Sequence, residues 1–141
     1  MKLLDFIACD DVRQEIGGKT SLMGVYSNLV IASPPTANAP TWPFQMRLSF
    51  FIRCMLESGD VKPDSFRVEC LRSGEVFSHV DGVAPMPEGV NIFALIIVNP
   101  AFPIQGTGPI SFRVIFKKED KTTNDLAPGY PLDVQLTSVV A

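Results

Sequence analysis

Proline and glycine are spread along the whole chain, and their spacing is the strongest constraint on its fold. Twelve prolines and ten glycines interrupt the 141 residues, so an uninterrupted helix of ordinary length has little room. Between these breaks, apolar and polar residues alternate with a period of two, which is typical of β-strands that bury one face. The pattern therefore predicts an all-β fold.

The clearest alternation runs over Phe44–Leu56, where every second residue is apolar. Val90–Val98 is nearly all apolar, which predicts a fully buried central strand. The other strands that the alternation predicts are Ser65–Leu71, Val76–Val80, Ile110–Phe116 and Leu132–Thr137.

The first thirty residues predict a β-hairpin. Leu3–Asp11 and Ser21–Ala32 are its apolar arms, and Gln14–Thr20 is a polar turn whose Gly17-Gly18 pair permits positive φ. Proline-rich Ser33–Pro43 predicts a loop, with Trp42 capping one end of the core.

Charged Lys117–Asp125 predicts a solvated hairpin loop. The strands and turns together predict a single antiparallel β-sandwich of about seven to nine strands over residues 1–141, immunoglobulin-like in arrangement. The Cys…Trp…Cys spacing of antibody domains is absent.

Composition narrows the classes of partner. The net charge is −3 and no basic stripe is present, which argues against nucleic acid and against an anionic membrane surface. No apolar run reaches the length of a membrane-spanning helix, and the run before Cys9 is too short for a secretion signal. We expect a cytoplasmic protein.

No residue pattern predicts catalysis, a metal site or a cofactor. Cys9, Cys54 and Cys70 are odd in number and widely spaced within apolar runs, so we interpret them as small buried residues without disulfides. The single histidine, His79, alternates with apolar neighbours and is expected to face solvent. We therefore expect a protein that is not an enzyme.

The densest charged cluster follows the first strand, at Asp10, Asp11, Arg13 and Glu15. One interpretation is a calcium or small-ligand site, but calcium needs six to eight oxygens. The favoured interpretation is a solvated turn in which Arg13 pairs with a carboxylate. Further ligands for calcium would have to come from other loops, for example from Asp60, Asp64 or Asp81.

Apolar residues exceed what one buried face per strand requires. Phe51 and Met55 lie on the polar side of the Phe44–Leu56 alternation, and Leu3–Asp11 and Val90–Val98 are apolar on both faces. Such a surplus indicates partner contact or self-association. The alternative is that the proline-rich loops fold over these faces.

The segments Cys9–Arg13 and Gly18–Tyr26 form a CDDVR…GKxSLxGVY pattern. This pattern, with the later Asn99–Pro103, resembles a family of small uncharacterised bacterial proteins that is classed as a domain of unknown function. The resemblance implies a bacterial or phage origin and a β-sandwich, and it carries no activity.

These observations predict a non-enzymatic module for protein–protein contact or assembly, whose partner is another protein or a further copy of the chain. We expect the hairpin to be the contact element because it combines apolar arms with the charged cluster. The candidate contact residues are Asp10, Asp11, Arg13, Glu15, Tyr26 and Phe51.

Overall fold

The computed structural model describes residues 1–32, 42–84 and 86–136, and these residues contain strands and turns without a helix. The side chains of Ile31, Ala32 and Phe44 are outside this description. The strands are β1 (Lys2–Gln14), β2 (Thr20–Val25), β3 (Leu29–Ala32), β4 (Phe44–Met46), β5 (Ser49–Met55), β6 (Ser65–Arg72), β7 (Glu75–Val83), β8 (Ile92–Ile97), β9 (Phe102–Ile104), β10 (Gly108–Lys118), β11 (Lys121–Leu126) and β12 (Leu132–Leu136).

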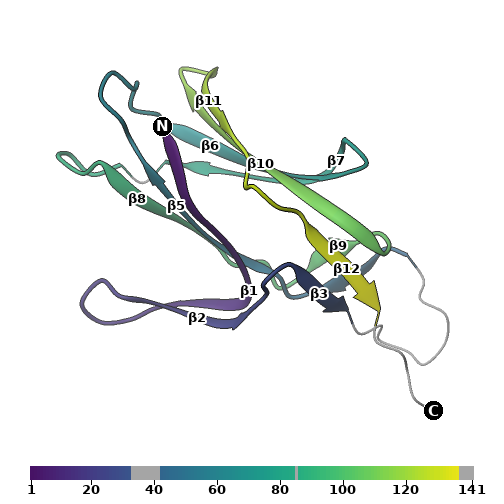
Figure 1. The fold of residues 1–141 in the computed structure, drawn as a ribbon. Coiled ribbons are helices and arrows are strands. Elements are labelled where there is room, and N and C mark those ends of the chain that lie inside the picture. Colours follow the sequence, from purple (N-terminus) through teal and green to yellow (C-terminus); the bar gives the residue numbers. More distant parts are fainter. Residues whose placement is uncertain (33–41, 85, 137–141) are drawn as a thin grey trace, which may run out of the picture.

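The strands form three sheets. A four-stranded sheet has the order β2-β1-β5-β8, and a six-stranded sheet has the order β3-β12-β10-β6-β7, with β11 paired to β10. Strands β4 and β9 form a separate two-stranded sheet. Figure 1 shows the two larger sheets as two layers.

The core lies between these two layers. One cluster of buried side chains joins residues from β1, β5 and β8 to residues from β6, β10 and β12. At its centre the ring of Phe112 lies 4.9 Å from Phe6 and 5.2 Å from Phe50, centroid to centroid. These rings connect the four-stranded sheet to β10, so their packing holds the layers together.

The all-β prediction is confirmed, but the predicted number of seven to nine strands is too low. The described residues contain twelve strands. Ser21–Ala32 is divided into β2 and β3, because the chain leaves β1 at Tyr26 and β3 joins the other sheet. There β3 pairs in parallel with β12, so the sheets are not purely antiparallel. Likewise, Phe44–Leu56 is divided into β4 and β5.

The prediction of a fully buried central strand at Val90–Val98 is wrong. Strand β8 is the edge of the four-stranded sheet. Its residues Phe93, Leu95 and Ile97 are buried, whereas Ile92 is 48% exposed. A continuous apolar run predicts burial on both faces, but here the second face is only partly covered: Ala94 and Ile96 are half-buried and Ile92 is exposed.

The loop predicted at Lys117–Asp125 is mostly strand. A tight turn at Glu119 and Asp120, whose φ values are 50° and 63°, reverses the chain into β11. The alternation does not predict β11 because all its side chains before Leu126 are polar, and it does not predict β9 because Phe102–Ile104 contains a proline.

Other predictions are confirmed. Leu48, Phe50, Ile52 and Cys54 are buried on one face of the Phe44–Leu56 segment, and Trp42 is half-buried against the core. The predicted loop Ser33–Pro43 lies almost entirely outside the described residues, as does the end of the strand predicted at Leu132–Thr137.

Candidate protein-contact surface

The β1–β2 hairpin extends beyond the strand that supports it. Pairing of β1 with β5 ends at Cys9 and Ser49, and from there to Gln14 the described partner of β1 is β2. Figure 1 shows this part of the hairpin turning away from β5. We call residues 10–25 the arm. Its exposed apolar side chains are Ile16, Met23 and Val25.

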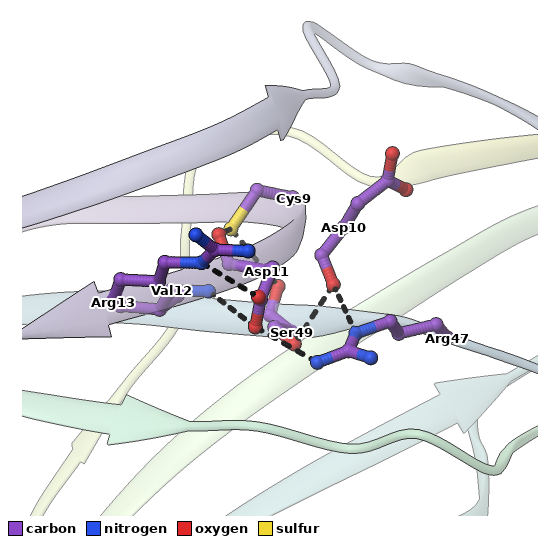
Figure 2. A network of polar contacts seen from close by, with 7 residues as sticks. All are labelled: Cys9, Asp10, Asp11, Val12, Arg13, Arg47 and Ser49. Carbon is purple, nitrogen blue, oxygen red and sulfur yellow. Dashed lines mark hydrogen bonds and ion pairs between the residues drawn. The ribbon is translucent and has the colours of Figure 1, made fainter.

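A polar network fastens the base of the arm to the start of β5 (Figure 2). The Arg47 Nε donates to the Asp10 carbonyl oxygen at 3.1 Å, and its Nη2 donates to Asp11 Oδ1 at 3.0 Å. The Ser49 Oγ donates to the same Asp10 carbonyl at 3.2 Å. Two strands that diverge at this point are thus held by one guanidinium and one hydroxyl group.

The Asp11 carboxylate is the acceptor at the centre of this network. The hydrogen bond from Arg47 is the main reason that the pKa of Asp11 is lowered, and its charge and the bond from Arg13 lower it further. The Val12 amide also donates to Asp11 Oδ1, at 3.0 Å. Asp11 therefore stays ionised and anchors the arm, and it is a poor candidate for a proton-transferring group.

The Asp10 carboxylate has a different set of neighbours, and Figure 2 shows it pointing away from Arg47. The Tyr26 hydroxyl donates to Asp10 Oδ1 at 2.6 Å. Gly24, with φ of +66°, lies directly against the carboxylate: an added Cβ would be 2.8 Å from Asp10 Cγ. Only glycine fits both this backbone conformation and this space.

Tyr26 gives a test of this contact in alkaline solution. Burial, followed by the hydrogen bond to Asp10, raises the pKa of Tyr26 to about 12. Since this lies above the value of about 10 for an unfolded tyrosine, the stabilisation from neutral Tyr26 is complete below pH ~10 and is lost as the pH rises toward 12.

We therefore expect a tyrosinate absorbance step near pH 12 that the Tyr26→Phe variant lacks. The second of the two tyrosines, Tyr130, serves as the internal reference. A tyrosinate titration that is the same in the variant and the wild type, apart from amplitude, would contradict the Asp10–Tyr26 contact.

The three cysteines are buried thiols without disulfides, as predicted. Burial raises the pKa of Cys54 and of Cys70 to about 12. Burial also raises the pKa of Cys9, and the charges of Asp10 and Asp11 add to this effect. All three thiols are therefore protonated at neutral pH, which is unsuitable for nucleophilic chemistry.

The solvent side of the four-stranded sheet is largely apolar. Phe50, Ile52 and Cys54 face the core, so Phe51, Arg53 and Met55 face outward. Three cross-strand rows follow from the register of β1, β5 and β8. We call these residues the outer face: Lys2, Met55 and Ile92; Asp5, Arg53 and Ala94; Ile7, Phe51 and Ile96.

An ion pair lies in the middle row of the outer face. Arg53 Nε donates to Asp5 Oδ2 at 2.6 Å, and the Arg53 side chain is 49% exposed. The register of β1 against β5 shifts between Leu3 and Asp5, which accommodates one extra residue and brings Lys2 and Asp5 to the same side of the sheet. Apart from this pair and Lys2, the residues of the outer face are apolar.

The polar network borders the outer face at one end. On the same side of the sheet, the next cross-strand pair after Ile7 and Phe51 is Cys9 and Ser49. Both of these residues are fully buried, beneath the contacts that Asp10 and Arg47 make. Charged groups thus border the outer face at this end, and a polar rim is common in protein interfaces.

The structure brings together four of the six candidate residues. Asp10, Asp11, Arg13 and Tyr26 lie at the base of the arm. Glu15 lies at the arm's tip, where its amide donates to the Lys19 carbonyl at 2.7 Å. Phe51 lies on the outer face instead, one cross-strand pair beyond the network.

Sequence reasoning missed Arg47, Ser49 and the Asp5–Arg53 pair. The available signal was weak: Arg47 and Arg53 occupy polar positions of the Phe44–Leu56 alternation. Their acidic partners are far away in the sequence, so only the pairing of β1 with β5 identifies them.

The carboxylates considered for calcium have other partners. Asp60 pairs with the Met1 amino group, Asp64 accepts from the Glu119 amide at 3.1 Å, and Asp81 pairs with Arg67 at 2.7 Å. Within residues 1–32, 42–84 and 86–136, no group of three or more acidic, histidine or cysteine side chains could hold a metal ion. His79 lies on the solvent side, as predicted, with its Nε2 3.5 Å from Asp81.

Comparison with family models, with curated proteins and with solved structures finds no match to this chain. In the described part of the chain, no helix is long and apolar enough to cross a membrane.

Proposed function

We propose that this chain is a non-enzymatic protein-contact module of a bacterial or phage system, and that it binds a protein partner through the outer face. The observation that carries the proposal is the apolar patch on the solvent side of β1, β5 and β8. A two-layer β protein needs to bury only the inner face of each sheet. An apolar outer face is therefore better explained by contact with a partner.

Phe51 is the expected anchor of this contact. It lies on the central strand β5, between Ile7 on β1 and Ile96 on β8. Large aromatic side chains near the centre of an apolar patch commonly dominate binding energy, while charged groups at the edge add orientation. Arg47 and Asp11 supply such charged groups at one end of the outer face.

Three further features belong to this proposal. The two larger sheets share one core, which supports a single immunoglobulin-like β-sandwich domain over residues 1–141. The bacterial or phage origin is supported by the resemblance of the Cys9–Arg13 and Gly18–Tyr26 segments to the uncharacterised bacterial family. A cytoplasmic location is supported by the three cysteines, which carry no disulfide.

The proposed function can be tested by immobilising the chain and exposing it to two samples, the same chain in solution and a lysate of the source cells. We expect the wild type to retain protein from at least one sample and Phe51→Lys to lose it. Val76→Lys is the matched control, because Val76 is an exposed apolar residue of β7 in the other sheet.

Equal capture by the Phe51→Lys and Val76→Lys variants would contradict the outer face as the contact surface. Capture of no protein from either sample by the wild type would contradict the proposed function as a whole. Circular dichroism of both variants would show that each keeps the β fold.

A further inference from the structure

We propose that the partner on the outer face is a second copy of this chain, packed face to face about a two-fold axis. This inference rests on the proposed function, since it names the partner of the same surface. In such a dimer Phe51 would lie against the partner's Ile7, and each Arg53 would lie beside the partner's Asp5.

The charges of the outer face favour a second copy. Asp5 and Arg53 lie side by side in the middle row, one acidic and one basic. A two-fold axis that passes between them would set each base against the acid of the other copy. A patch with charge of one sign would repel its own copy, whereas this central pair is complementary to itself. Lys2 is the other charged group of the face, at its end row.

The Arg53 guanidinium has further N–H donors that could bond the Asp5 carboxylate of a second copy. Among the described residues it donates through Nε to Asp5, and both Nη groups are without a hydrogen bond in that part of the chain. An arginine carries five N–H donors in a planar fork that suits a carboxylate. The partner's Asp5 would take an Nη donor while the bond within each chain is kept.

The outward face of the six-stranded sheet is rich in charged side chains, unlike the outer face. The solvent side of the six-stranded sheet carries a ladder of ion pairs, in which Arg67 pairs with Asp81 and Arg113 with both Glu69 and Asp125. Charged ladders of this kind suit exposure to water. This side also exposes Val76 and Val83 on β7, so the two outward faces differ chiefly in the ladder of ion pairs.

The size of the patch sets the expected strength. Strands about 4.8 Å apart, with rows about 7 Å apart, give three strands and three rows an extent of roughly 10 by 14 Å between the Cα atoms. This is small beside the ~800 Å² per partner of a standard interface. We therefore expect a weak, reversible dimer that forms only at high protein concentration.

A charge exchange between two variants tests the dimer. In Asp5→Arg both central groups are basic, and in Arg53→Asp both are acidic, so each variant alone should remain monomeric in sedimentation equilibrium at concentrations where the wild type is dimeric. Mixed in equal amounts, the two variants should form a heterodimer, because each face then meets the opposite charge.

The matched control uses the ion pair of the other sheet. Arg67→Asp and Asp81→Arg alter an exposed pair of similar geometry, and both variants should dimerise as the wild type does. Loss of the bond within the chain cannot explain restored association in the mixture, since neither variant regains that bond.

Two results would overturn the inference: a wild type that stays monomeric at the highest soluble concentration, or a wild-type dimer that the Asp5 and Arg53 variants leave unchanged. If the wild type stays monomeric while a protein from the source cells is captured in a Phe51-dependent way, the second copy is the wrong partner and the proposed function stands.

Discussion

Alanine in place of Phe50 should lower the free energy of unfolding by about 3–5 kcal/mol, whereas alanine at the adjacent Phe51 should lower it by roughly 1 kcal/mol or less. Phe50 is 2% exposed and contacts the rings of Phe6, Phe102 and Phe112. Its removal leaves a cavity between the two layers. Phe51 is half-buried on the outer side of the sheet, so its truncation opens no cavity between the two layers.

Urea unfolding of the two variants at neutral pH and low protein concentration measures this difference. Low concentration matters because association through Phe51 would otherwise add to the stability of the wild type. Equal losses at the two positions would contradict the outward orientation of Phe51, and with it the outer face as a surface open to partners.

Alanine at Gly24 should destabilise the pairing of the arm by about 2–3 kcal/mol. Its φ of +66° is unfavourable for any residue with a Cβ, and that Cβ would also overlap the Asp10 carboxylate. Displacing Asp10 would break its bond with Tyr26. Hydrogen exchange of the amides in β1 and β2 beyond Cys9 measures the effect locally.

Gly59→Ala is the matched control, because Gly59 has a similar φ of +89° and nothing within 4 Å of an added Cβ. That variant should show only the backbone cost of about 1 kcal/mol. Adding Asp10→Ala to Gly24→Ala should restore the part of the lost stability that comes from overlap between the added Cβ and the Asp10 carboxylate. If Gly24→Ala and Gly59→Ala cost the same, the close packing of Gly24 against Asp10 is wrong.

Alternation in the sequence was enough to identify the all-β class and the inward residues of β5 and β10. It works there because Phe50, Ile52, Phe112 and Val114 are all buried, while their immediate neighbours are mostly polar or half-buried. It fails at β11, where every residue before Leu126 is polar and the turn at Glu119 and Asp120 positions the strand.

Only part of the candidate surface could be predicted from the sequence. The surplus apolar character of Phe51 and Met55 was visible, because they interrupt an otherwise polar face. Their neighbours on the outer face, Ile7 and Ile96, become identifiable only when the register of β1, β5 and β8 is known. The charged cluster was visible too, but its role in fastening the arm depends on Arg47, which is 36 residues from Asp11.

Amide NMR of the isotope-labelled wild type, recorded from dilute to concentrated solution, tests the contact surface most directly. We predict that the concentration-dependent shifts centre on Ile7, Phe51, Arg53 and Ile96, and that they disappear in Phe51→Lys. Spectra that are unchanged by concentration at these four residues, or shifts confined to the arm at residues 10–25, would contradict face-to-face association through the outer face.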